Sequence, residues 1–216
     1  MISLLKNLLL LLIIYLPGKV GNKIRCFFYR NKFKKFGKNI FIGTGVKFIG
    51  YDLISLGDNV KIDDNCLIET GTNLIGNVKF KQIDKSPISR GEIFISSNIH
   101  ICRNVELVGY GGLFIGDNSV LSSSCKLYSH SNLPNDYKNK SSYVSLMPYE
   151  NSFFINGPIV IKNNVWLGLE VIVNAGVTIN DNAFVIMKSV VIKDIPPNTV
   201  AKGFPASEFK ERFLNE

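Results

Sequence analysis

The chain has few of the residues that enzymes most often use for metal binding and redox chemistry. Its 216 residues include two histidines, four cysteines and one tryptophan. Two histidines cannot supply a zinc site with three histidine ligands, which excludes a carbonic anhydrase of that type. The cysteines, at positions 26, 66, 102 and 125, lack the spacing typical of zinc or redox motifs. We therefore expect them to be reduced packing residues of a cytosolic protein, and we expect no metal.

Acidic residues are absent from the first 51 residues, which contain ten lysines and arginines. The rest of the chain has 15 basic and 17 acidic residues, so the net charge of +8 originates in the amino-terminal segment. The apolar run from Leu8 to Leu16 has nine residues, whereas a membrane-spanning helix needs about 20. A short apolar helix beside many cations favours peripheral attachment to an anionic membrane surface.

Other interpretations of residues 1–38 are open. A helix of this kind can instead pack within the protein's own oligomer. A secretory signal peptide is disfavoured because no small-residue cleavage site follows Leu16. Nucleic-acid binding is disfavoured because no recognition module accompanies the basic residues.

The clearest pattern in the chain is the recurrence of an apolar residue at every sixth position. A strand alternates with period two and a helix with period 3.6, whereas hexapeptide repeats are typical of a parallel β-helix. A second column of small or β-branched residues follows four positions after the first. The first column is Leu56, Ile62, Ile68, Ile95, Ile101, Leu107, Ile115, Leu121, Leu127, Ile161, Leu167, Val173, Ile179, Val185 and Val191. The second is Val60, Cys66, Thr72, Ile99, Val105, Ser119, Cys125, Val165, Val171, Val177, Ala183, Ser189 and Ile195.

These columns predict an all-β fold in which three hexapeptides make one turn of a triangular prism. Ile161 should then stack under Ile179, with turns about 4.8 Å apart. Asparagine and glycine cluster between the rungs, where corners require left-handed or bridge conformations. We expect a single β-helix domain over residues 39–206, preceded by the helical segment and followed by a tail at 207–216.

Three interruptions break the period: residues 76–92, residues 110–112 and a long excursion at 131–157. Long loops in a compact solenoid usually carry function. His130 stands where the excursion leaves the prism, and histidine is the usual general base near neutral pH. His100 precedes an inward isoleucine and should be an outward, solvated or interface residue. In this frame neither histidine lies near a cysteine.

Four motifs in the last third of the chain carry a family resemblance: VWLG at 165–168, NAGVTI at 174–179, KDIPPN at 193–198 and GFPA at 203–206. With the six-residue columns and the histidine that opens a loop, residues 38–208 resemble the hexapeptide-repeat acyltransferases. Within that superfamily they are most similar to O-acetyltransferases of bacterial surface polysaccharides, such as capsule, lipopolysaccharide O-antigen or exopolysaccharide. A left-handed β-helix is implied by the resemblance alone, because most parallel crossovers are right-handed.

The resemblance implies a homotrimer that uses acetyl-CoA, with active sites between neighbouring prisms. His130 matches the general base that takes the proton from a sugar hydroxyl of a glycan or glycolipid acceptor. Trp166 matches an aromatic residue near the thioester, although it can instead pack against a neighbouring subunit. A backbone N–H near Gly168 or the Trp166 indole would bind the oxyanion. The expected location is the bacterial cytoplasm, with peripheral contact to the cytoplasmic face of the inner membrane.

The resemblance also assigns the remaining residues that contact the substrates. The coenzyme is expected on Gly168, Leu169, Met187, Ile192, Lys193 and Lys210. Ile186 and Lys188 are bulkier than the small residues usual in that coil, and Ser207 replaces an expected cation. Acceptor contacts are expected from Tyr137, Tyr143, Tyr149 and Glu150, which can instead pack the loop, and Glu150 or Asp136 could orient His130.

Three alternatives use the same solenoid. An amino-sugar N-acetyltransferase would use the same histidine and coenzyme with an amine acceptor. Membrane contact and the lack of a GxGxxG nucleotide-binding domain favour O-transfer. A catalytically silent scaffold is a different class of function, and binding of CoA would discriminate against it. A serine acetyltransferase is disfavoured, because only about 40 residues precede the prism.

Overall fold

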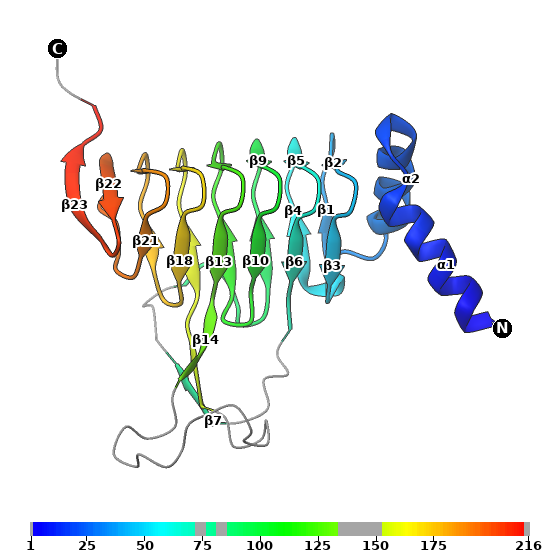
Figure 1. The fold of residues 1–216 in the computed structure, drawn as a ribbon, viewed down its shortest axis with the longest axis horizontal. Coiled ribbons are helices and arrows are strands. Elements are labelled where there is room, and N and C mark those ends of the chain that lie inside the picture. The colour runs from blue at the N-terminus through cyan, green and yellow to red at the C-terminus, as the bar shows by residue number, and fades with distance from the viewer. Residues whose placement is uncertain (1, 72–76, 81–85, 134–152, 214–216) are drawn as a thin grey trace.

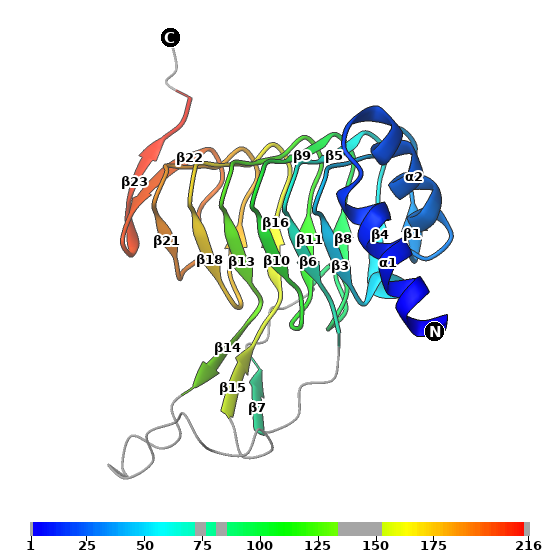
Figure 2. The same cartoon turned by 45° about the vertical axis from the view of Figure 1, so that its right-hand side comes forward.

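A computed structural model describes residues 2–71, 77–80, 86–133 and 153–213. Three sheets form the three faces of a prism, seen from two directions in Figures 1 and 2, and the fold is a left-handed parallel β-helix. Their strands pair in parallel except for the last pair of face B, β22 with β23, which is antiparallel. Face A contains β1 (Lys35–Phe36), β4 (Ile54–Leu56), β8 (Ile93–Ile95), β11 (Leu113–Ile115), β16 (Ile159–Ile161) and β19 (Thr178–Ile179). Face B contains β2 (Phe41–Ile42), β5 (Val60–Ile62), β9 (Ile99–Ile101), β12 (Val120–Leu121), β17 (Trp166–Leu167), β20 (Phe184–Val185), β22 (Thr199–Gly203) and β23 (Ala206–Glu211). Face C contains β3 (Lys47–Ile49), β6 (Leu67–Glu69), β10 (Glu106–Val108), β13 (Lys126–Tyr128), β18 (Ile172–Asn174) and β21 (Val190–Val191).

The core consists of the two predicted columns. All fifteen residues of the first column have 0% exposure, and those of the second that the structure describes are at most 2% exposed. Ile161 pairs with Ile179 in adjacent parallel strands, as the three-hexapeptide turn predicts. Because aligned branched side chains exclude water along the whole axis, hydrophobic burial supplies the main stabilisation of the prism.

The corners confirm the predicted use of asparagine. Nine asparagines of the described segments have φ between +54° and +61°, a left-handed conformation that asparagine tolerates better than most residues. Several of them also form a ladder along one corner. Asn59 Nδ2, for example, donates to Asn98 Oδ1 at 2.8 Å, and Asn98 Nδ2 donates to Asn118 Oδ1 at 3.0 Å.

The first and third interruptions share a small sheet, which the sequence did not predict. Strand β14 (His130–Leu133) pairs antiparallel with β15 (Phe153–Asn156), and β15 pairs parallel with β7 (Asn77–Phe80) from the first interruption. This three-stranded sheet projects from the side of the prism (Figure 2). The strand that pairs with the His130 strand is therefore itself held by a segment more than 70 residues earlier in the chain, since β7 Asn77 is opposite β15 Phe153.

The amino-terminal segment forms two helices, α1 (Ile2–Tyr15) and α2 (Gly18–Arg30), beside the first coil of the prism (Figure 1). A 3₁₀ turn, η1 (Tyr51–Leu53), joins β3 to β4. Neither described helix combines the length and apolar character required to span a bilayer. Regular structure also extends past both expected boundaries of the prism, because β1 starts at Lys35 and β23 runs to Glu211.

Candidate active site

His130 lies where β14 leaves the corner between faces C and A, and its ring is partly buried. The Tyr110 ring packs edge-on against it, with 4.7 Å between ring centroids. The Tyr110 hydroxyl in turn donates to Glu69 Oε1 at 2.6 Å. Tyr110 comes from the second interruption, so the extra residues of that turn place an aromatic wall beside the histidine.

The two buried side-chain atoms without a hydrogen-bond partner in the described part of the chain are His130 Nδ1 and Asn156 Oδ1. These residues face each other in the register of β14 and β15. Asn156 is fully buried, and its Nδ2 donates to the Tyr110 carbonyl at 3.2 Å. A ring nitrogen that carries hydrogen in one tautomer and an amide oxygen, both without partners on opposed residues, are chemically complementary.

Burial lowers the pKa of the His130 imidazole, because desolvation disfavours its charged form. The Glu69 carboxylate acts in the opposite direction and raises the same pKa. Burial is the larger effect, so the ring is neutral near pH 7. A neutral imidazole can accept a proton, as a general base must.

Trp166 is 48% exposed on face B, where its ring packs against Phe184 at 5.0 Å between centroids. Its indole Nε1 donates to Ser122 Oγ at 3.0 Å. The Gly168 N–H donates to the Val185 carbonyl at 2.8 Å as part of the sheet ladder. The Gly168 N–H itself is therefore held by the sheet, and the prediction that a backbone N–H near Gly168 or the Trp166 indole binds an oxyanion stays a prediction.

The predicted coenzyme residues lie in three places on the prism. Leu169 and Met187 are exposed at the corner between faces B and C, where the Lys188 N–H donates to the Leu169 carbonyl. Lys210 lies in the same row of face B as Trp166, through the pairs Trp166–Phe184, Phe184–Val200 and Val200–Lys210. Ile192 and Lys193 follow β21 at the corner between faces C and A, the corner from which His130 also leaves.

Within one chain His130 and Trp166 therefore occupy different sides of the prism. His130 lies beyond the end of face C, whereas Trp166 is in the middle of face B. The predicted acceptor residues Tyr137, Tyr143, Tyr149 and Glu150 lie outside the described residues, as does Asp136.

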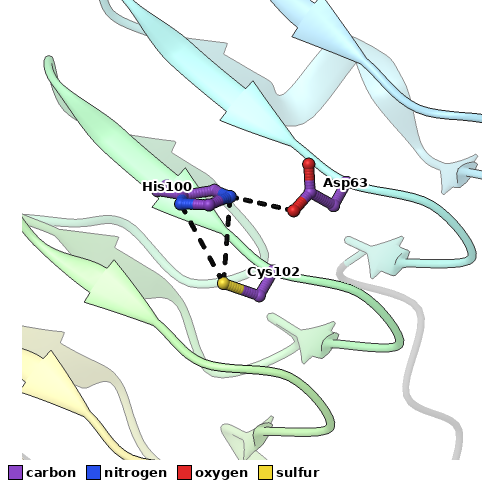
Figure 3. Close-up of side chains that lie close together, drawn as sticks. All are labelled: Asp63, His100 and Cys102. Atoms are coloured by element: carbon purple, nitrogen blue, oxygen red, sulfur yellow. Dashed lines mark hydrogen bonds and ion pairs between the residues drawn. The ribbon is translucent and has the colours of Figure 1, made fainter.

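A third group of chemically active side chains was missed from the sequence. His100 points outward as predicted, but its Nε2 is 2.9 Å from Asp63 Oδ2 and 3.8 Å from Cys102 Sγ (Figure 3). The expectation that no cysteine lies near a histidine is thus wrong. His100 and Cys102 flank the inward Ile101, so the alternation of a strand places both on the outer face.

No established protein-family model matches the chain. It is 31% identical over 182 residues to a dTDP-4-amino-4,6-dideoxy-D-glucose acyltransferase of Escherichia coli, covering 83% of each chain. It is 37% identical over 126 residues to the galactoside O-acetyltransferase of E. coli K12, covering 53% of this chain and 55% of the relative.

Solved structures agree on the fold. AntD, an N-acyltransferase from Bacillus cereus, solved as a serine-to-cysteine mutant with coenzyme A and dTDP-4-amino-4,6-dideoxyglucose, gives a TM-score of 0.70 at 21% identity, with 88% of this chain and 89% of AntD covered. The Vibrio cholerae hexapeptide-repeat acetyltransferase VCA0836, complexed with acetyl coenzyme A, gives 0.53 at 22% identity, with 88% and 77% covered. Three observations lead to one assignment: the repeat columns, His130 at the corner where the excursion begins, and the relative matched over most of both chains. The chain belongs to the hexapeptide-repeat acyltransferases.

Proposed function

We propose that the protein transfers the acetyl group of acetyl-CoA to a sugar hydroxyl of a bacterial surface polysaccharide or its precursor. The proposal rests on the position of His130. This half-buried imidazole has a lowered pKa and stands where the long excursion leaves the prism. Galactoside O-acetyltransferase and a putative colanic acid biosynthesis acetyltransferase, WcaF, among the relatives support a glycan hydroxyl as acceptor.

In the proposed reaction His130 accepts the proton of the acceptor hydroxyl as its oxygen attacks the thioester carbonyl. The tetrahedral oxyanion then collapses, the carbon–sulfur bond breaks, and the CoA thiolate takes the proton from the imidazolium. No covalent enzyme intermediate is needed. Positioning both substrates in one cleft supplies a further part of the rate, which can reach roughly 7 kcal/mol.

A cleft between protomers explains why His130 and Trp166 lie on different sides of one prism. We propose a homotrimer in which the His130 corner of one prism faces the Trp166 side of its neighbour. The coenzyme would then lie along Trp166, Leu169 and Met187, with Lys210 available to its phosphates.

Amine transfer is the second candidate, favoured by the match to an amino-sugar acyltransferase over 83% of each chain. One experiment separates the two. The protein is incubated with acetyl-CoA and purified glycan precursors, release of free CoA thiol is followed, and the product is treated with mild alkali. An ester is cleaved and an amide survives, so an alkali-stable product would overturn the O-transfer proposal. Absence of thiol release with every acceptor and absence of stabilisation by CoA would favour a silent scaffold.

Asn156 is proposed as the positioning residue for the base. Catalytic hydrogen bonds are often long without substrate and tighten in the complex. Asn156 Oδ1 is an unpaired acceptor on the residue opposite His130, and it would accept a hydrogen bond from the Nδ1–H tautomer of the ring. We expect Asn156→Ala to lower kcat about 10-fold, a part of the usual general-base contribution. Losing the acceptor should also move the acidic limb of the pH profile to lower pH, whereas Asn156→Asp should move it to higher pH by stabilising the imidazolium. Coincident profiles for all three proteins would contradict this role.

Helix α1 is proposed to hold the enzyme on an anionic membrane surface. Leu8, Leu9, Leu11 and Leu12 are between 50% and 65% exposed, so apolar side chains project from several sides of the helix. Its carboxyl end is fixed to the prism, since the Gly45 N–H donates to the Ile14 carbonyl at 2.9 Å. The cations of the following segment would add about 1 kcal/mol each near acidic lipids.

We expect the triple variant Leu9→Gln, Leu11→Gln, Leu12→Gln to lose at least about 10-fold in binding to phosphatidylglycerol vesicles, because each buried leucine contributes about 1.5 kcal/mol or more. Co-sedimentation measures this, with phosphatidylcholine vesicles and high salt as conditions that should weaken wild-type binding. Phe209→Gln with Phe213→Gln is the matched control, since both rings are exposed at the other end of the prism. Unchanged sedimentation of the leucine variant would contradict the proposal. Dissociation of its oligomer without vesicles would assign the helix to subunit packing instead.

A further inference from the structure

Asp63, His100 and Cys102 converge from two adjacent coils of face B (Figure 3). Strands β5 and β9 pair in parallel with Lys61 opposite His100 and Ile62 opposite Ile101. The next residues along these strands are Asp63 and Cys102, whose N–H groups donate to the Ile101 and Leu121 carbonyls. The carboxylate and the thiol therefore stand one above the other, with the imidazole diagonally across.

One ligand atom from each side chain lies within 4.8 Å of the other two, and no other trio of this kind is found in the described segments. A tetrahedral zinc ion with bonds of about 2.0 to 2.3 Å separates its ligand atoms by roughly 3.3 to 3.6 Å. The distances from His100 Nε2, 2.9 Å to Asp63 Oδ2 and 3.8 Å to Cys102 Sγ, lie on either side of that range. Small rotations of the ring and the thiol would bring the three atoms to ligand positions.

Neighbouring groups orient the Asp63 carboxylate and leave space for a fourth ligand. Lys61 Nζ holds the other oxygen of Asp63, Oδ1, at 3.1 Å, so Oδ2 is the oxygen turned toward the histidine. The His100 side chain is 38% exposed, which leaves room for water as a fourth ligand. Three protein ligands and one open position are typical of zinc sites that bind an exogenous ligand.

A thiol–imidazole–carboxylate relay is the other chemistry that these residue types can perform. Such a relay needs the carboxylate on one ring nitrogen and the thiol on the other. Here Asp63 contacts Nε2, and Nε2 is also the nitrogen nearer to Cys102 Sγ, with Nδ1 at 4.0 Å. The thiol is therefore not placed on the nitrogen opposite Asp63, as a relay requires, whereas all three groups lie close enough together to share one ion.

We propose that Asp63, His100 and Cys102 bind one divalent transition-metal ion of the zinc class. Imidazole nitrogen, thiolate sulfur and carboxylate oxygen are the donors that zinc takes in proteins. On binding, the thiol proton leaves to solvent and a metal–sulfur bond forms, with no change in oxidation state. The site shares face B with Trp166, since His100 and Trp166 both pair with Val120 of the intervening strand.

The test uses Co²⁺ as a spectroscopic probe of the full-length, reduced protein. A cobalt–thiolate bond produces a charge-transfer absorption in the near ultraviolet, which should saturate at one ion per chain. Cys102→Ser should abolish it, and His100→Asn should weaken Co²⁺ binding at least 10-fold. Cys26→Ser is the matched control, because Cys26 is also a partly exposed free cysteine and should leave the signal unchanged.

Two results would overturn the proposal: no charge-transfer band at one equivalent of Co²⁺, or an equal band in the Cys102→Ser protein. His130→Ala should keep the band, because His130 is not among the three ligands. Failure of the acetyl-transfer proposal therefore leaves the metal test intact, and a negative metal test leaves acetyl transfer intact.

Discussion

His130→Ala should lose at least about 100-fold in acetyl transfer, because general-base catalysis contributes roughly 10² to 10⁴ in rate. Alanine removes the imidazole at this corner and leaves the neighbouring Glu69 carboxylate, which accepts a hydrogen bond from the Tyr110 hydroxyl. The loss should appear in kcat, with little change in the KM for acetyl-CoA. Thiol release under saturating acetyl-CoA measures it.

The other histidine supplies a control for this variant. His100→Ala removes an imidazole on face B and should leave the rate within about threefold of wild type, a difference below 1 kcal/mol. Both variants should keep the wild-type oligomeric state, because neither side chain belongs to the buried columns. Wild-type turnover by the His130→Ala protein would refute the assignment of the base.

The pH dependence gives an independent check on His130. Its pKa is lowered by burial, so the neutral, active form persists as the pH falls through the ordinary value of about 6.5. The acidic limb of kcat/KM should therefore lie below pH 6.5. Glu69→Gln removes the charge that raises this pKa, and the limb should then move further toward acid.

Arg25→Met should release the helical pair from the prism, because Arg25 is the buried cation that joins them. Its side chain is 1% exposed and donates to four backbone carbonyls. Nη1 reaches the Leu16 carbonyl at 2.7 Å, and Nε reaches the Ile42 carbonyl at 3.0 Å. Methionine fills much of the same volume but leaves the Ile13, Leu16 and Ile42 carbonyls without the arginine donor, at about 1 to 3 kcal/mol each. The Ile14 carbonyl keeps its hydrogen bond from the Gly45 N–H.

We expect a loss of about 3 kcal/mol or more in the docking free energy of α1. Hydrogen exchange of the α1 amides should accelerate about 100-fold, while amides of the central strands stay protected. Lys23→Met is the control, since Lys23 is exposed on the same helix and loses the same charge. Equal exchange rates in α1 for both variants would show that Arg25 does not hold α1 and α2 on the prism.

The regular part of the fold could be predicted in detail because it depends on local alternation. Each inward residue of the columns is identified by its spacing from its neighbours, and the period alone stacks Ile161 on Ile179. His130 was found for a related reason: it stands where the period stops. No neighbouring structure had to be known for either inference.

The cluster of Asp63, His100 and Cys102 could not be predicted, because an interruption of the repeat separates the two strands that carry these residues. Ile62 pairs with Ile101, a separation of 39 residues, whereas Leu167 pairs with Val185 after 18. A period of 18 therefore does not align Asp63 with Cys102. Asn156 was missed for the same reason, since the excursion separates it from His130 and its pairing depends on β7 and β14.

The projecting sheet has a consequence for exchanging acceptor specificity between related enzymes. Strand β15 is hydrogen-bonded on one side to β14 and on the other to β7, which comes from an insertion nearer the amino terminus. A chimera that grafts only residues 131–157 from a relative would place the β15 of one protein beside the β7 of the other, so the two paired strands would no longer come from one sequence. Both insertions should therefore be transplanted together, as one module, for His130 to keep its place.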